Sequence, residues 1–223
     1  MTAGSICSVG AAKGKFTPPA VTDCPVIPDP LVAQQAPAVG SCTYTNEKIS
    51  SGTVSLAPGV YCGGLTITGG ASVTLTPGEY IIDGGQLLVE NGSSLTTVNA
   101  GIYLTGAGAT LWFGPDCTIN MTAPTSGPLA GLLVFEDRNA PTGQTHIIYS
   151  DNAPVLHGTI YLPQNELHVE TNGPVSNAST FTIVIVRTLT LAKAANLYLN
   201  SNYNASNIPV PGGLDHSLPY LSQ

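Results

Sequence analysis

A repeat of about 22 residues is the feature that most restricts how this chain can fold. Moving the sequence by one period places Leu65 on Leu87 and Ile67 on Val89, and other apolar columns keep the same spacing. Periods of this length are typical of solenoids, in which each repeat buries its apolar face against the next. A β-sandwich also has regular short strands, but it gives no reason for one spacing to persist in several columns.

Each period contains short runs that alternate apolar and polar residues, such as Leu65–Thr68 and Leu167–Val169. Gly-Gly, Pro-Gly and Asn-Gly pairs separate these runs, as expected for strands joined by tight turns. A strand that pairs with its own equivalent one period later must run parallel to it, at a spacing of about 4.8 Å. The sequence therefore predicts an all-β, right-handed parallel β-helix of roughly seven coils, with about 22 residues per coil.

The two ends of the chain differ from this repeat, and the register is also lost at residues 123–139, where we expect an irregular insertion. Residues 1–45 are rich in Pro and Cys and predict an extended lead-in that could cap the first coil. Residues 46–205 predict the β-helix, and residues 206–223 a C-terminal cap or tail. End coils of a β-helix expose unpaired strand edges. If the two end segments leave these edges open, copies of the chain can associate end to end.

The charge of the chain excludes two classes of partner. Lys and Arg number 6 against 13 Asp and Glu, and no cationic side chain occurs between Lys48 and Arg138. Such a chain has almost no means of neutralising phosphates, so nucleic acid and anionic membrane surfaces are poor partners. No apolar run reaches the roughly 18 residues of a membrane span, and Met1–Gly10 lacks the features of a signal peptide. Either a targeting segment has been removed or the chain is a fragment.

Several segments of the chain resemble the sequences of one protein family and occur in the same order. They are Pro28–Leu31, Cys42–Thr45, Ser51–Leu65, Ala123–Pro128, Phe135–Pro141 and Gly158–Pro163. Together they are similar to the C-terminal extracellular region of TadE/TadG-type proteins, which are encoded with bacterial tight-adherence (Flp) pili. The likeness spans about residues 20–212. Relatives often carry cysteines near the positions of Thr180 and Ser201, where this chain has none.

The resemblance implies a bacterial protein at the cell surface, outside the cell or in the periplasm, with a membrane anchor N-terminal to this region. We accordingly expect a non-enzymatic module that contacts pilus or cell-surface components and needs no cofactor. In such an oxidising compartment we favour disulfides between Cys42 and Cys62 and between Cys7 and Cys24, although four cysteines allow three pairings. Cys117 falls in the apolar column of Val73 and Leu95 and is expected to be a buried, inert thiol.

Two groups of polar residues are candidates for an alternative function, in which the β-helix binds or cleaves carbohydrate. Glu136 and Asp137 could act as the paired carboxylates of glycoside hydrolysis, but neighbours in a strand point to opposite sides, and Arg138 is expected to pair with one of them. His146 and His168 lie one period apart, and the repeat predicts that both point outward and stack. Two His residues alone make only a weak metal site, since three or four ligands are needed.

A third candidate surface is visible only through the repeat. The period predicts an outward row of Thr74, Thr96 and Thr118, with Ser72 and Ser94 beside it. Such a flat hydroxyl surface could bind a regular surface such as a glycan, ice or another copy of the chain. Thr is also simply favoured in strands, where its hydroxyl bonds along the ladder.

Overall fold

The computed structural model describes residues 6–13, 18–26 and 28–214, and the chain divides into two compact units. The first unit consists of residues 1–34 and 211–223, and in it β1 (Ile6–Cys7) pairs in parallel with β2 (Ala20–Val21). The second unit, residues 35–210, is the solenoid. Its elements are β3 (Tyr44–Ile49), β4 (Thr53–Leu56), β5 (Gly59–Ile67), β6 (Ser72–Leu75), β7 (Gly78–Asp83), β8 (Leu87–Val89), β9 (Ser94–Thr97), β10 (Ala100–Thr105), β11 (Leu111–Phe113), β12 (Thr118–Thr122), β13 (Leu132–Glu136), β14 (Thr145–Ile148), β15 (Asn152–Thr171), β16 (Pro174–Val175), β17 (Thr182–Lys193), β18 (Asn196–Leu197) and the 3-10 helix η1 (Tyr203–Ala205).

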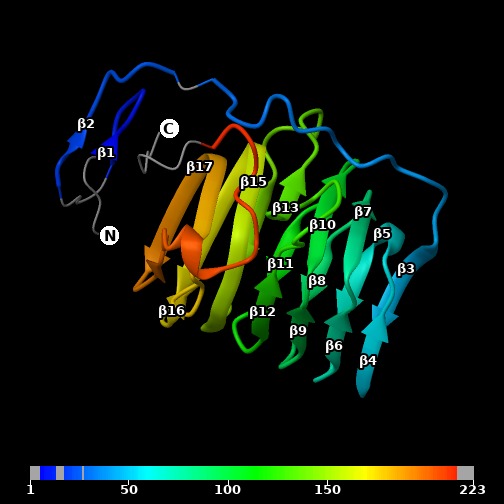
Figure 1. Cartoon of the computed structure of the whole chain (residues 1–223). Helices are drawn as coiled ribbons and strands as arrows, with labels where there is room; N and C mark the ends of the chain where they lie inside the picture. Colours follow the sequence, from blue (N-terminus) through cyan, green and yellow to red (C-terminus); the bar gives the residue numbers. More distant parts are fainter. Residues whose placement is uncertain (1–5, 14–17, 27, 215–223) are drawn as a thin grey trace. The chain divides into compact units, whose positions relative to one another are not determined.

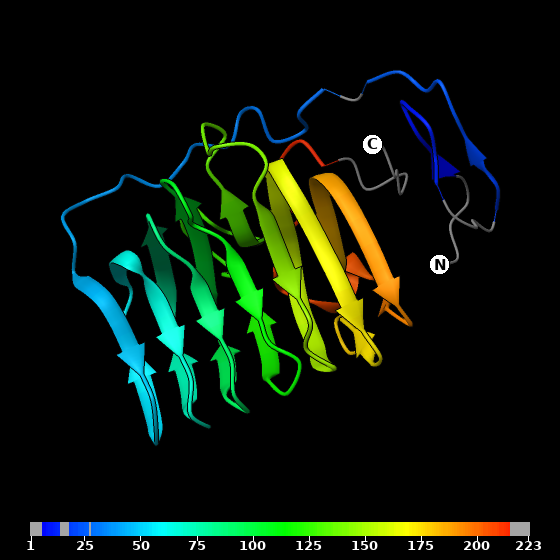
Figure 2. The same cartoon turned by 180° about the vertical axis from the view of Figure 1, so that it is seen from behind.

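The second unit is a parallel β-helix of about seven turns with about 22 residues per coil, as the repeat predicts. Figures 1 and 2 show its coils stacked in sequence order, from cyan β4 at one end to orange β17 at the other. Each coil contributes to three faces. Face 1 contains β4, β6, β9, β12, the start of β15, β16 and β18. Face 2 contains the start of β5, β7, β10, β13, the middle of β15 and the start of β17. Face 3 contains most of β3 and the end of β5, then β8, β11, β14 and the ends of β15 and β17.

Side-chain alternation builds the core between the three faces. On face 3, one inward row contains Ile67, Val89, Phe113, Ile148 and Val169, each paired with the next along the helix axis and each buried. At about 25 cal/mol for each Å² of buried apolar surface, stacked rows of this kind are the main stabilising contribution.

The coils are not all of one length, and this corrects the uniform period. Ser94 follows its partner Ser72 by 22 residues, but Thr118 follows Ser94 by 24. The two additional residues lie at the corner between face 2 and face 3, where Gly106–Thr110 occupies the place that Gly84–Gln86 has in the coil before. Leu95 therefore pairs with Ile119, so the prediction that Cys117 continues the column of Val73 and Leu95 is wrong.

The insertion is more regular than the sequence suggests. Residues 132–136 form β13, which pairs with β10 and β15 and extends face 2. The irregular parts are two loops on either side of this strand. A Cβ atom at Gly101 would lie 2.7 Å from Leu129 Cβ, so the first loop packs directly on face 2.

The segment after the last coil supplies apolar side chains to the end of the core. Phe181 forms an antiparallel bridge with Ser201, and its ring lies 5.5 Å from that of Tyr203. Ile208 is buried in the core, and Val210 packs against it. Residues 200–210 therefore cover apolar side chains of the final coil, while residues 215–223 lie outside the described part of the chain.

Candidate functional site

The two loops beside β13 and the corner of β15 build a buried polar cluster around Glu136. Glu136 ends β13, and its side chain is fully buried, as is that of His146 on β14. Glu136 Oε1 lies 2.9 Å from His146 Nε2, and His146 Nδ1 accepts the Leu111 N–H at 3.3 Å. Because Nδ1 acts as the acceptor, the ring proton is assigned to Nε2, which donates to the carboxylate.

Two further groups donate hydrogen bonds to the Glu136 carboxylate. Asn165 Nδ2 donates to Oε1 at 2.7 Å, and the Gln164 N–H donates to Oε2 at 3.0 Å. Three donors and no acceptor surround the carboxyl group in the described part of the chain, which is the environment of a carboxylate rather than a carboxylic acid. A fully buried carboxylate cannot touch a polysaccharide, so Glu136 is not positioned to cleave one.

The expected neighbours of Glu136 lie outside this cluster. Asp137 accepts hydrogen bonds from Thr105 Oγ1 at 2.9 Å and from the Asn139 N–H at 2.8 Å. Burial by itself raises the pKa of Asp137, but these hydrogen bonds outweigh it and hold the pKa below its ordinary value. The Arg138 guanidinium lies over the rings of Phe135 and Tyr161, at 5.2 and 5.3 Å from their centroids. Glu136 and Asp137 thus point to different surroundings, as the alternation predicts.

The two histidines do not stack, and the prediction that both point outward is wrong. Ile147 pairs with His168, and His146 pairs with Leu167, so the register is one residue away from the expected one. A slip of one residue turns every side chain of a strand to its other side. His146 is therefore in the core, while His168 is partly exposed. In the described part of the chain, no three His, Cys, Asp or Glu side chains gather closely enough to hold a metal ion.

The predicted hydroxyl row on face 1 is partly correct. Thr74 pairs with Thr96, and Ser72 pairs with Ser94, whose hydroxyl donates to Ser72 Oγ at 2.9 Å. Thr118, however, continues the Ser72–Ser94 row rather than the Thr row, because of the two additional residues in the corner before it. Asn152 Nδ2 in turn donates to Thr118 Oγ1 at 2.9 Å. Two hydrogen bonds of this row, Ser94 to Ser72 and Asn152 to Thr118, thus run along the helix axis between neighbouring coils.

The cysteines follow the predicted roles where the structure describes them. Cys42 and Cys62 form a disulfide that joins the chain before β3 to β5. Cys117 is a buried free thiol, and burial raises its pKa. Cys24 is disulfide-bonded. The side chain of Cys7 lies outside the described residues, so its pairing with Cys24 stays a prediction.

The outer side of face 3 carries aromatic residues that the repeat did not single out. Trp112, the one Trp of the sequence, pairs with Leu88 on one side and Ile147 on the other, and Ile147 pairs with His168. These four side chains form a single partly exposed row along the helix axis. The ring of Tyr149 lies edge-on to the rings of both Trp112 and His168, at centroid distances of 5.6 and 6.0 Å. We call Trp112, Tyr149 and His168 the aromatic cluster.

Polar side chains border the aromatic cluster. On one side, Thr145 Oγ1 and Thr190 Oγ1 donate to the Glu166 carboxylate. On the other side, Glu170 lies 3.1 Å from His168 Nε2 and 3.0 Å from Lys193 Nζ. The hydrogen bond from Lys193, and then that from His168, hold the pKa of Glu170 below its ordinary value, and Glu170 raises the pKa of Lys193.

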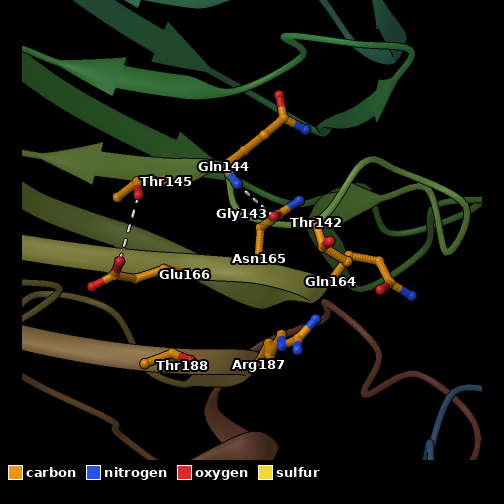
Figure 3. Close-up of a pocket in the computed structure, with 9 residues that line it drawn as sticks. All are labelled: Thr142, Gly143, Gln144, Thr145, Gln164, Asn165, Glu166, Arg187 and Thr188. Carbon is orange, nitrogen blue, oxygen red and sulfur yellow. Dashed lines mark hydrogen bonds between the residues drawn. The ribbon is translucent and has the colours of Figure 1, made fainter.

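Two shallow depressions open beside this border. The larger, about 360 Å³, lies at the corner of faces 2 and 3 and is lined by Thr142, Gly143, Gln144, Thr145, Gln164, Asn165, Glu166, Arg187 and Thr188. Figure 3 shows Arg187 of β17 extending toward the corner of β15 that carries Gln164 and Asn165. The smaller, about 270 Å³, is lined by Pro115, Tyr149, Asp151, Glu170, Asn172 and Lys193. Thr145 and Tyr149, which line one depression each, are four residues apart, or about 13 Å in an extended chain.

The walls of the larger depression are held by hydrogen bonds. The Gln144 N–H donates to Asn165 Oδ1 at 2.9 Å, and the Gln144 side chain bonds the Gly108 N–H and the Pro141 carbonyl. Since Asn165 also donates to the buried Glu136, the internal cluster fixes the shape of this depression from below.

No protein-family model, curated protein or solved structure matches the chain. Within residues 6–13, 18–26 and 28–214, no helix has both the length and the apolar character needed to span a membrane.

Proposed function

We propose that this chain is a non-enzymatic, extracellular β-helical module of a bacterial surface protein associated with tight-adherence pili. Its flat faces would contact pilus or cell-surface components. The observation that carries this proposal is the outer side of face 3, where Trp112, Leu88, Ile147 and His168 form a partly exposed row on a rigid sheet. Aromatic side chains on a rigid surface are typical of binding sites, because little conformational entropy is lost when they are covered.

Two further observations support the location and the absence of catalysis. The Cys42–Cys62 disulfide is of the kind that persists in oxidising compartments outside the cytosol. Glu136, the carboxylate best placed in sequence for hydrolysis, is fully buried and saturated by donors. The association with pili itself rests on the resemblance of segments such as Ser51–Leu65 and Phe135–Pro141.

The second candidate function is carbohydrate binding without cleavage. The aromatic cluster favours it, because aromatic rings bordered by carboxylate and hydroxyl groups can stack on sugar rings and bond their hydroxyls. Self-association is a weaker candidate. Charged residues lie on the edge strands at both ends: Arg187 and Lys193 on β17, and Glu47 and Lys48 on β3. Charges on an edge strand oppose its pairing with another copy of the chain.

A sedimentation assay with isolated pili tests the proposed function. Purified chain is mixed with pili from a strain that assembles them and, as a control, with the matching fraction from a strain that does not. The proposal predicts that the chain sediments with the pili in a saturable way and stays in solution with the control fraction. Equal sedimentation with both fractions, or with neither, would contradict the association with pili.

A further inference from the structure

We infer that the outer side of face 3 is a binding site for an uncharged polysaccharide, with the aromatic cluster of Trp112, Tyr149 and His168 at its centre. This inference rests on the proposed function of surface contact and names the ligand class and the residues. The site lies on the outer side of the coil, on strands β11, β14 and β15, of which the last two also contribute Thr145 and Glu166 to the depression at the corner of faces 2 and 3.

The three rings of the aromatic cluster are held in a fixed arrangement. Trp112 and His168 lie in one outward row and are separated by the single strand β14, so their backbones are about 9.6 Å apart at 4.8 Å per strand. Tyr149 contacts both rings edge-on, which holds all three in place. Three rings held in this way need no rearrangement to receive a sugar chain.

Polar groups lie on both sides of the rings. Glu166, Thr145 and Thr190 lie on one side of His168, and Glu170 with Lys193 lies on the other. These groups offer acceptors and donors to ring hydroxyls on both sides of a sugar stacked on the cluster. The depressions at the two ends of these strands would receive the neighbouring sugars or their substituents.

The charge of this surface favours an uncharged ligand. The carboxylates of Glu166 and Glu170 lie beside the aromatic cluster on face 3, and Lys193 is already paired with Glu170. The chain as a whole has a net charge of -7. Arg187 lines the larger depression, but its single charge is outweighed by these carboxylates and by the net charge, so a polyanion such as an acidic polysaccharide is disfavoured here and an uncharged chain is not.

The sole Trp of the sequence provides a direct probe, since Trp112 lies in the centre of the inferred site. Cellohexaose, chitohexaose and mannohexaose are each titrated into the purified chain while the Trp emission is recorded, with heparin as an anionic comparison. The inference predicts a saturable change in emission with at least one of the uncharged hexasaccharides and none with heparin. Binding of heparin alone, or no change with any hexasaccharide, would overturn it.

Variants that keep Trp112 locate the site. Tyr149→Ala and His168→Ala should each raise the dissociation constant roughly tenfold, as expected for a residue at the centre of a contact. Tyr149→Phe keeps the ring and should bind like the original chain, and Thr96→Ala on face 1 is the matched control. Circular dichroism checks that each variant is folded. Equal weakening by Thr96→Ala would place the ligand elsewhere.

The pilus assay separates failure of the inference from failure of the proposed function. If the chain sediments with pili but no hexasaccharide changes the Trp112 emission, the module binds surfaces without recognising these glycans, and only the inference is overturned. If neither occurs, the proposed function is itself contradicted.

Discussion

His146 Nε2 lies 2.9 Å from Glu136 Oε1, and both side chains are completely removed from solvent. The pair connects β13, which lies between two irregular loops, to β14 on the next face. Through Asn165 and Gln164 it also reaches β15 in the following coil. The cluster therefore joins consecutive coils at the point where the repeat is interrupted.

Replacing Glu136 by Gln should destabilise the β-helix. Every group that faces the carboxylate is a donor, so an amide NH₂ in its place would leave two donors facing each other in a buried site. We expect a loss of about 2–4 kcal/mol in the free energy of unfolding, or a decrease of roughly 5–15 °C in Tm. Thermal unfolding followed by circular dichroism measures it. Asp116→Asn, which changes an exposed carboxylate in the same way, should have little effect, and equal losses in both variants would contradict the account.

Removing the Cys42–Cys62 disulfide should loosen the first coil and leave the centre of the β-helix intact. The two cysteines are 20 residues apart, and a loop of this size is worth about 3 kcal/mol. Coils of a solenoid interact mainly with their neighbours, so the effect should be local. In Cys42→Ser/Cys62→Ser, amide hydrogen exchange should become faster in Tyr44–Ile49 and remain unchanged in Leu132–Glu136. Faster exchange along the whole β-helix would argue against local coupling.

Cys117 should resist alkylation in the folded chain. Its side chain is buried, and burial raises the pKa of the thiol, so little of the reactive thiolate is present at neutral pH. Mass spectrometry after treatment with iodoacetamide at pH 7.5 should find Cys117 unmodified in the native protein and modified after denaturation. Rapid, complete labelling of the native protein would mean that the side chain is accessible.

Asp137 should contribute to a loss of stability in acid. Its pKa is lower in the folded chain than in the unfolded one, where a free Asp has a pKa of about 3.9. Its contribution is therefore complete above the unfolded pKa and is lost as the pH falls through the folded pKa. Urea denaturation between pH 6 and pH 2 should show a shallower decline in Asp137→Asn than in the original chain. Parallel curves for the two proteins would assign the acid sensitivity to other groups.

The fold could be predicted because alternation and turn residues are local signals. Strands such as Ser72–Leu75 and Leu87–Val89 repeat at one spacing, and a parallel β-helix follows from pairing each with its copy. The lengths of the corners could not be predicted, because a Gly-rich corner has the same turn signals whether it has three residues, as in Gly84–Gln86, or five, as in Gly106–Thr110. The two additional residues place Thr118 in the row of Ser72 and Ser94 instead of the Thr row. A register change of one residue likewise places His146 in the core.

The candidate site was harder to predict than the fold. In Leu111–Phe113 the alternation alone places Trp112 outward between two buried residues, which was the one local signal available. Its contact with Tyr149 depends on the register across the interruption, where Trp112 pairs with Ile147 after 35 residues rather than about 22. Glu136 and His146 likewise meet only because β13 and the following loop fold back at this corner.

The most direct test of the account is whether the chain binds a surface without altering it. Purified chain is incubated with insoluble polysaccharides, and both the bound protein and the soluble reducing sugar are followed over time. The account predicts a saturable bound fraction, weakened by Tyr149→Ala, with no more sugar released than in the absence of protein. Sugar release that rises with protein concentration and disappears in Asp137→Asn would contradict it and identify a carbohydrate-cleaving enzyme.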